Sequence, residues 1–481
     1  MKLFYVFILV LVFAGMNPVS GQCRISESAR LVADDGTEGD YFGYSVDTSA
    51  NRAMVGAYRN DDNGSNSGSV YVYRLDSDNW IQEAKLSASD GEMNDWFGWS
   101  VAVSGETIVV GADGDRDAGD WTGSAYIFHY DGENWTEQAK LLADGTGYYW
   151  EEFGFDVAIS ADSNTVLIGA NKANDNGFKS GAAYIFRYES SDWVQQAKLL
   201  ASDGVELATF GNSVAISEDG NTAFIGAPGK DTSGYTAGSV YVFEFEDGQW
   251  LENQKLLASD AAHGDHFGHS LAISGNTLVV GAYGDDDAEP NDLYCNSGSA
   301  YIFNYDGTNW TERAKLELPG DRCRNQFGWA VDVFDDTVVV GAPDGHWETT
   351  YGPGSAYIFG FDGLNWLAKA RLVSSDAAFG DHFGWSVAVF GEKVLVGAEL
   401  DDVRGLDSGA AYTFNAGICP GDFDGDGDVD LVDLVSLACA WLSVPESPEW
   451  NPKYDIDRGA DGIINMSDLA VLAENWLISY R

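Results

Sequence analysis

The chain has 481 residues, and its 76 Asp and Glu against 26 Lys and Arg give a formal net charge of −50. This acidic balance argues against binding to nucleic acid or to anionic membrane surfaces, both of which require Lys and Arg. Hydrophobic residues make up 45% of the chain and aromatic residues 13%, so it can form packed cores despite its charge.

The first 21 residues have the pattern of a secretory signal peptide. Lys2 supplies the positive start, residues 3–14 form the apolar run, and residues 19–21 form a small-residue exit with cleavage before Gln22. The apolar run is too short to span a membrane comfortably, and no later segment approaches about 20 apolar residues. We therefore expect a secreted, extracellular protein, either released or held at the cell surface.

A Phe-Gly pair recurs seven times, about every 56 residues, beginning at Phe42, Phe97, Phe153, Phe210, Phe267, Phe327 and Phe383. A Gly-Ala pair follows each one after 14 or 16 residues, beginning at Gly56, Gly111, Gly169, Gly226, Gly281, Gly341 and Gly397. Next comes an aromatic stretch, and in six units an Asn-Trp or similar step then leads into a Lys-Leu stretch, or Arg-Leu in the sixth. Alternation and Val, Ile, Tyr and Phe enrichment predict four short strands in each unit.

Seven units of four strands predict a mainly β fold, a closed seven-bladed β-propeller over residues 22–417. The repeated Phe, Tyr and Trp are interpreted as packing between blades, because one blade cannot bury both of its faces. The seventh unit ends at Phe414 without its fourth strand, and a matching strand stands at residues 28–33. We expect this N-terminal strand to complete blade seven and close the ring.

The positions of the cysteines suggest a disulfide bond that would hold this closure together. Counted against the second unit, Cys23 and Cys419 both correspond to position 133, at the tip of one hairpin. A Cys23–Cys419 disulfide would contribute on the order of 3–5 kcal/mol. Pairing of Cys419 with Cys439 is the alternative, and Cys295 and Cys323 flank one hairpin of the fifth unit.

The seven units resemble FG-GAP repeats, the propeller repeats of integrin α-subunits and of many exported bacterial proteins. The Phe-Gly pairs and the Gly-Ala or Gly-Ala-Pro pairs carry this resemblance over about residues 28–416. The resemblance implies a fold that serves many binding roles. Integrin repeats hold calcium in an Asp-rich hairpin before Gly-Ala-Pro, but the fullest hairpin here, residues 217–221, lacks that ladder of Asp residues. Those calcium sites are therefore not expected.

Acidic residues cluster instead after the Gly-Ala pairs. The groups are Asp113, Asp115 and Asp117, then Asp285, Asp286 and Asp287, then Asp401 and Asp402. Equivalent loops of a propeller lie on one face, so this face should be strongly negative. It acts either as a solvated rim or as a surface for cations or cationic ligands. The alternating Asp113, Asp115 and Asp117 are the best single candidate for a metal or ligand site in the propeller.

Residues 422–433 have the spacing of a twelve-residue calcium loop with Gly427 at the sharp turn. Its oxygen ligands are Asp422, Asp424, Asp426, Asp428, Asp430 and Asp433. A second copy supplies Asp457, Asp461, Asn465 and Asp468, and is the weaker site because Gly459 falls at position 3. Alternatively, Asp455 and Asp457 occupy positions 1 and 3 of the second loop, which then contains two inserted residues. Each loop precedes an amphipathic helical pattern, and calcium is the expected cofactor.

Two loop–helix units with Asp at position 12 and no entering helix resemble a type I dockerin, over residues 418–481. This resemblance implies a small α-helical domain that binds a cohesin-like module in the presence of calcium. Such domains attach exported proteins to scaffolds or cell surfaces. Their recognition residues lie early in each helix, which corresponds here to Ser436, Leu437, Val471 and Leu472.

The repeats show little interruption of the kind that a catalytic site introduces. His263, His266 and His269 are the main deviation, but His266 and His382 occupy the same repeat position and are interpreted as repeat variation. We therefore expect an exported, non-catalytic binding or adaptor protein whose propeller presents a face to a protein or carbohydrate ligand. The alternatives are a polysaccharide-degrading component of a dockerin-bearing extracellular system and a structural, self-associating surface protein.

Overall fold

The computed structural model describes residues 25–416, with gaps at 78, 144–149, 231–235, 287–295, 319–324 and 344–351. The chain forms two compact units, of which the larger contains Glu27–Ala356 and Val373–Phe414 and the smaller includes Tyr357–Leu372. The regular elements of the described residues are 28 β-strands. Within these residues no helix is long and apolar enough to cross a membrane.

The strands form seven sheets of four, and we number these sheets as blades in chain order. Their bounds, blade by blade, are β2 (Val46–Ser49), β3 (Arg52–Ala57), β4 (Ser69–Asp76) and β5 (Asn79–Leu86); β6 (Ser100–Ser104), β7 (Thr107–Ala112), β8 (Ser124–Tyr130) and β9 (Trp135–Leu141); β10 (Phe153–Ile159), β11 (Thr165–Ala170), β12 (Ala182–Glu189) and β13 (Asp192–Leu199); β14 (Ser213–Ile216), β15 (Thr222–Gly226), β16 (Val240–Glu246) and β17 (Gln249–Leu256); β18 (Ser270–Ser274), β19 (Thr277–Ala282), β20 (Ser299–Tyr305) and β21 (Trp310–Leu316); β22 (Val331–Phe334), β23 (Thr337–Ala342), β24 (Ser355–Phe361) and β25 (Trp366–Leu372); β26 (Val387–Phe390), β27 (Lys393–Ala398), β28 (Ala410–Asn415) and β1 (Ala29–Leu31).

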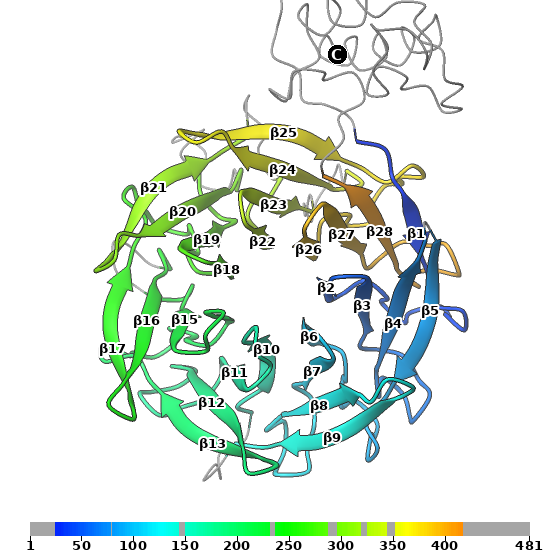
Figure 1. The fold of residues 1–481 in the computed structure, drawn as a ribbon, viewed down its shortest axis with the longest axis horizontal. Helices are drawn as coiled ribbons and strands as arrows, with labels where there is room; N and C mark the ends of the chain where they lie inside the picture. The colour runs from blue at the N-terminus through cyan, green and yellow to red at the C-terminus, as the bar shows by residue number, and fades with distance from the viewer. Residues whose placement is uncertain are drawn as a thin grey trace, which may run out of the picture. The chain divides into compact units, whose positions relative to one another are not determined.

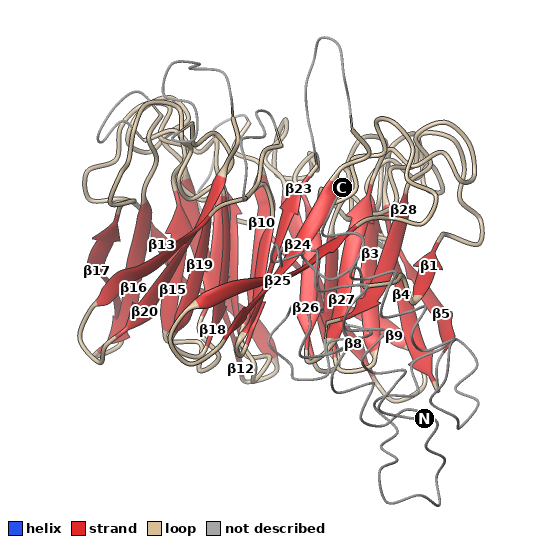
Figure 2. Ribbon diagram, turned by 90° about the horizontal axis from the view of Figure 1, so that it is seen from above, coloured by secondary structure: helices blue, strands red, loops and turns tan. Residues whose placement is uncertain are grey.

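Within the larger unit the blades follow one another around a central axis (Figure 1). The first strand of each blade lies nearest the axis, as β2, β6 and β10 show, and the fourth strand lies outermost, as β5, β9 and β13 show. The strands run between two layers of loops (Figure 2). This seven-bladed propeller confirms the prediction from the repeats.

The N-terminal strand supplies the outermost strand of blade seven. β1 pairs antiparallel with β28, with Ala29 opposite Thr413 and Leu31 opposite Ala411. The Ser28 amide donates a further hydrogen bond to the Thr413 carbonyl at 2.7 Å. This is the arrangement that the missing fourth strand of the seventh unit predicts. The proposed partners Cys23 and Cys419 lie outside the described residues, as do Cys295, Cys323 and Cys439.

The Phe-Gly pairs fix how neighbouring blades pack. Phe97 is fully buried among apolar residues of blades one and two, and its ring meets those of Tyr126 and Phe128 edge-on at 5.4 and 5.8 Å. A Cβ atom on Gly68 would lie 2.0 Å from the Phe97 carbonyl oxygen, and Gly98 has a φ of 91°. Only glycine permits such a close approach and such a φ without strain. The sequence interpretation of the repeated Phe as packing between blades is confirmed.

Candidate functional site

The acidic loops that follow the Gly-Ala pairs are held by the protein's own cations. In blade two, Lys140 Nζ lies 2.8 Å from Asp115 Oδ2, 2.7 Å from Asp117 Oδ2 and 2.9 Å from Asp90 Oδ2. The Tyr126 hydroxyl hydrogen-bonds to Asp90 and Asp115 at 2.9 and 3.0 Å. The Lys140 ammonium also stands 5.2 Å from the centre of the Tyr126 ring. We call this arrangement the Lys–Asp–Tyr clamp.

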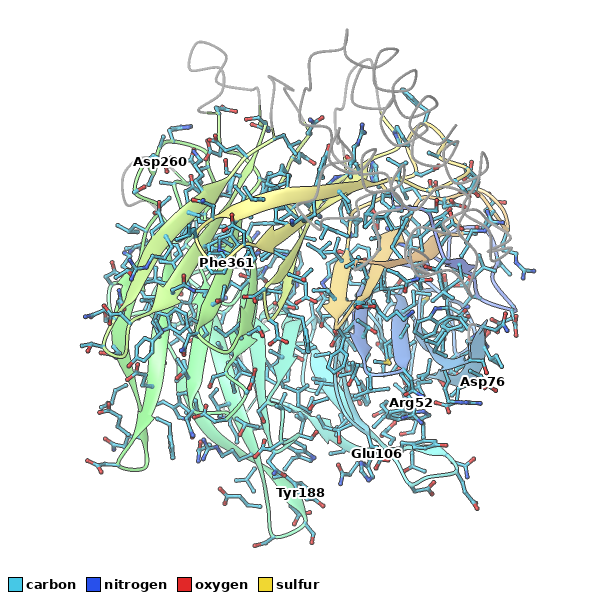
Figure 3. The ribbon with its side chains drawn as sticks, turned by 45° about the horizontal axis from the view of Figure 1, so that its top comes forward. Arg52, Asp76, Glu106, Tyr188, Asp260 and Phe361 are labelled. Carbon is cyan, nitrogen blue, oxygen red and sulfur yellow. The ribbon has the colours of Figure 1, made fainter. Side chains whose placement is uncertain are left out.

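Equivalent clamps recur around the ring. They comprise Lys85, Asp35, Asp62 and Tyr71 in blade one; Lys255, Asp203 and Tyr241 in blade four; Lys315, Asp260, Asp285 and Tyr301 in blade five; and Arg30, Asp376, Asp401 and Tyr412 in blade seven. Figure 3 shows Asp260 on the loop side, at the opposite end of the strands from the hairpin residue Glu106. The side chains of Asp115 and Asp285 are only 3% exposed, so they depend on these cations for charge balance.

The structure does not bring Asp113, Asp115 and Asp117 around one centre. Asp115 and Asp117 share Lys140, whereas Asp113 lies in the electrostatic field of Glu152 and Lys172. Within the described residues, no group of three or more His, Cys, Asp or Glu side chains could hold a metal ion. In the clamps, a lysine of the Lys-Leu stretch, or Arg30 in blade seven, therefore lies against these acids, and it pairs with the buried Asp115 and Asp285 in blades two and five. That lysine recurs at one repeat position, which is the signal that could have revealed the clamp.

The ten candidate calcium ligands of the tail, from Asp422 to Asp468, lie outside the described residues.

A second set of side chains surrounds the axis, at the position that follows each Phe-Gly pair. We call its aromatic members the axial arc: Tyr44, Trp99, Phe155, His269, Trp329 and Trp385. Ring centroids lie 4.7 Å apart for Tyr44 and Trp99, 5.7 Å for Tyr44 and Trp385, and 4.7 Å for Trp329 and Trp385. His269 lies 4.6 Å from Trp329, and Phe155 lies 5.9 Å from Trp99.

The residue that precedes each Phe-Gly pair adds a second row to the arc. All seven have a left-handed backbone, with φ from 53° to 59°, at Tyr41, Trp96, Glu152, Thr209, His266, Gln326 and His382. This conformation is costly for residues other than glycine, by about 1–3 kcal/mol each, and is often found where ligands bind. It stacks Trp96 on Trp99 and His382 on Trp385. Four of these seven side chains carry rings, namely Tyr41, Trp96, His266 and His382, and they add a partial second layer of rings.

Charged groups stand between these rings. Arg59 lies over Tyr41 at 4.4 Å, and Lys172 forms an ion pair with Glu152. Burial raises the pKa of Glu399, although His382 Nδ1 at 3.4 Å opposes that shift. Burial also lowers the pKa of His269 to about 3, so this imidazole is neutral.

Asp113 is the most unusual group at the axis. It occupies the repeat position of Tyr58, whose ring contacts Tyr44 and Trp99. Asp113 is 1% exposed, and its Oδ1 atom has no hydrogen-bond partner in the described structure. Burial, reinforced by Glu152, raises the pKa of this carboxyl well above its usual value. A buried acceptor without a partner is costly, and a bound hydroxyl group would satisfy it.

Sequence reasoning missed the axial arc, because it treated all repeated aromatics as packing. The Phe of the Phe-Gly pair is invariant in the seven units, but two positions later the residue changes from Tyr to Trp, Phe, Asn or His. Packing inside a repeated interface favours one residue type at each position. The variation two residues after the Phe was therefore the sequence signal that could have revealed the axial arc.

The geometry agrees with a comparison against known protein families. The FG-GAP repeat matches seven segments, residues 25–73, 80–128, 135–186, 193–243, 250–303, 310–359 and 366–414. Each segment begins with the outermost strand of one blade and continues with three strands of the next. The chain therefore belongs to the FG-GAP repeat family.

Proposed function

We propose that this chain is an exported, non-catalytic binding protein that works as an adaptor. In this proposal the axial arc of the propeller binds a carbohydrate, and the dockerin-like tail binds calcium and attaches to a cohesin-type partner. The observation that carries the first half is the axial arc itself. The acidic spacing of residues 422–433 supports the second half.

The arc suits a neutral polyhydroxyl ligand. Tryptophan and tyrosine faces can pack against the apolar C–H faces of a sugar ring, and Asp113 Oδ1 can accept a hydrogen bond from a sugar hydroxyl. A cationic ligand fits less well, because Arg59 already covers the Tyr41 ring and Lys172 lies near Asp113. These features favour a carbohydrate over a peptide rich in Lys or Arg.

A glycan array probed with the full chain tests the ligand class. We expect binding to a restricted set of glycans, and loss of that binding in Trp99→Ala and Trp329→Ala. Trp193→Ala is the matched control, because Trp193 lies on the outer strand β13. If wild type binds no glycan but captures a protein through Trp99 and Trp329, the ligand is a protein. If the Trp99 and Trp329 variants bind glycans like wild type, the arc is not the site.

A calcium titration of the full chain tests the tail. We expect calcium to increase helical circular dichroism and to enable binding to a cohesin module, since ligation and folding are coupled in such loops. The double variant Asp422→Ala with Asp433→Ala should lose both effects and retain glycan binding. Equal helicity in calcium and in chelator would rule out the calcium loop.

A glycoside-active protein is the second candidate, favoured by one observation. Burial raises the pKa of both Asp113 and Glu399, and a carboxyl that stays protonated can act as a general acid. Turnover of a bound glycan that Asp113→Asn abolishes, without loss of binding, would support this candidate over the adaptor.

A further inference from the structure

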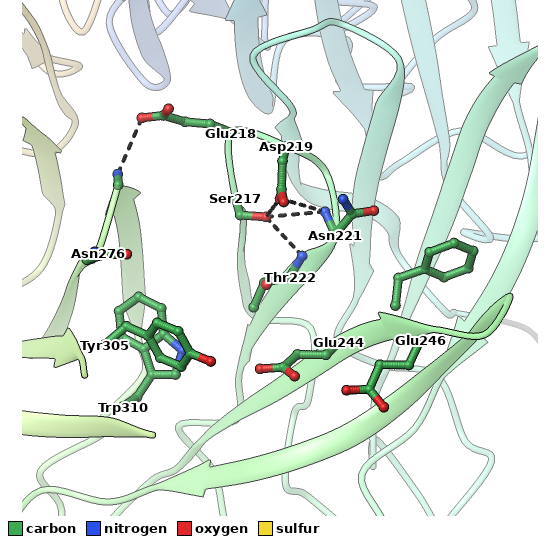
Figure 4. A pocket seen from close by; sticks show the side chains of 12 residues that line it. Ser217, Glu218, Asp219, Asn221, Thr222, Glu244, Glu246, Asn276, Tyr305 and Trp310 are labelled. Atoms are coloured by element: carbon green, nitrogen blue, oxygen red, sulfur yellow. Dashed lines mark hydrogen bonds between the residues drawn. The ribbon is translucent and has the colours of Figure 1, made fainter. Parts of the chain in front are cut away.

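A cleft of about 500 Å³ lies between blades four and five, on the side of the hairpin turns and away from the clamps. Glu244 and Glu246 of β16 form one wall, and Asn276, Tyr305 and Trp310 of blade five lie opposite (Figure 4). Neither Glu244 nor Glu246 forms a side-chain hydrogen bond or ion pair within the described structure. The cleft therefore combines two available carboxylates with a pair of aromatic rings.

The corresponding place between blades three and four is filled by an arginine. The Arg187 guanidinium lies 4.3 Å from the Phe245 ring centre and 6.0 Å from that of Trp250. Its Nη2 atom donates to the Gly220 carbonyl at 3.0 Å and to Asn221 Oδ1 at 2.9 Å. Blade four thus holds a guanidinium of its neighbour with one aromatic pair and two hairpin oxygens.

The groups that hold Arg187 have counterparts in the cleft. Asn276 corresponds to Asn221, since its carbonyl accepts from the Tyr305 amide at 3.0 Å as that of Asn221 accepts from the Phe245 amide at 2.9 Å. Tyr305 and Trp310 lie 5.3 Å apart, as Phe245 and Trp250 lie 5.5 Å apart.

The arginine itself is what changes. Arg187 pairs with Thr165 across its sheet and Glu244 pairs with Thr222, so the two occupy the same place in the strand register. Blade five therefore has the aromatic pair and the hairpin asparagine that hold a guanidinium group in blade four. Blade four, however, has a glutamate at the repeat position from which blade three supplies its arginine.

A second interface places a guanidinium group over the equivalent aromatic pair. Between blades one and two, Arg52 comes from a different strand, yet its guanidinium lies 4.4 Å from the Tyr130 ring centre and 5.4 Å from that of Trp135. In blades two and four the aromatic pair is thus covered by an arginine of the preceding blade. The arginine comes from the second strand in one case (Arg52) and from the third strand in the other (Arg187).

We propose that the cleft between blades four and five binds the guanidinium group of an arginine side chain on a partner protein. The planar guanidinium can stack on Tyr305 and donate to the hairpin oxygens while it pairs with Glu244. An ammonium group has neither the plane nor the fork to do all three. This site is separate from the axial arc and does not depend on the carbohydrate proposal.

Isothermal titration calorimetry of the full chain with an acetyl-Gly-Arg-Gly-amide peptide tests the proposal. The isosteric citrulline peptide should bind at least tenfold more weakly, because it lacks the charge. Glu244→Gln should weaken Arg-peptide binding by roughly tenfold, the loss expected for one charge-assisted hydrogen bond. Glu189→Gln is the matched control, since Glu189 stands beside Arg187 as Glu246 stands beside Glu244, and it should bind like wild type.

Glu244→Arg gives a second, independent readout. The new side chain should rebuild the arrangement of Arg187, abolish peptide binding and leave the thermal midpoint equal to or above that of wild type. Equal binding of the arginine and citrulline peptides, or full binding by a folded Glu244→Arg variant, would overturn the proposal. A lysine peptide that binds as tightly would overturn its guanidinium specificity. If arginine methyl ester binds as tightly as the peptide, the ligand of the cleft is a small molecule and not a partner protein.

Discussion

The clamps and the axial arc are both built from positions that recur in every blade, but they differ in what the repeats preserve. The clamp keeps one chemistry in the five blades for which it is described, with a cation, one or two carboxylates and a tyrosine hydroxyl. The arc keeps the backbone, including seven left-handed residues, and varies the side chain from Trp to Glu. In a repeated fold, preserved chemistry indicates a structural role, whereas varied chemistry on a preserved backbone indicates a place for recognition.

The sharpest test compares Phe97 and Trp99, which lie two positions apart in the sequence. Phe97→Ala removes a ring packed between blades and should lower the free energy of unfolding by about 4 kcal/mol. Trp99→Ala removes a half-buried ring of the arc and should cost about 1 kcal/mol. Chemical denaturation of both variants measures the difference. Equal losses would assign the arc to the core instead of to binding.

The clamps should respond strongly to loss of their cation. Lys140→Ala leaves the buried Asp115 unpaired and should destabilise the protein by about 3 kcal/mol. Lys198→Ala is the matched control, because its partner Asp175 is 29% exposed and can be solvated; its loss should stay near 1 kcal/mol or below. If both losses are small, the carboxylates at the rim do not need the lysines.

Acids near the axis and acids at the rim should have opposite pH dependence. Burial raises the pKa of Asp156, on the inner strand β10, to about 7, although two backbone amides oppose the shift. A raised pKa means that the folded state holds the proton more tightly. The stability of wild type relative to Asp156→Asn should therefore fall as pH rises from 4 to 7, by about 1 kcal/mol or more.

At the rim, burial also disfavours the charge of Asp203, but hydrogen bonds from Lys255 and Tyr241 outweigh it and lower its pKa to about 2. The stabilisation from this carboxylate is present above pH 4 and is lost as pH falls towards 2. The stability of wild type relative to Asp203→Asn should therefore rise as pH increases from 2 to 4. Urea unfolding across pH checks both variants, and the same trend in both would remove the distinction between the two regions.

The regular part of the molecule could be predicted from the sequence, because it repeats. The spacing of Phe42, Phe97 and their counterparts predicts the blades, and the unit that ends at Phe414 without a fourth strand predicts the role of β1. Local periodicity decides both features, so one sequence is sufficient for them.

The candidate sites depend on contacts between units, which spacing does not reveal. Asp115 and Asp117 look like a metal-binding pair until Lys140, more than 20 residues later, is seen to hold both. The cleft at Glu244 becomes visible only when Arg187 is found in the equivalent place one blade earlier. The calcium loops and the cohesin-type partner remain predictions.

The pairing of β1 with β28 has a mechanical consequence. The chain enters the described ring through β1 and leaves it through β28, which lies between β1 and β27 in its sheet. If the tail tethers the protein while the ring holds a ligand, tension on the tether enters β28. Hydrogen bonds to both neighbours then share the load, whereas an outermost strand would have one neighbour only. A tethered propeller built in this way resists being pulled open from its attached end.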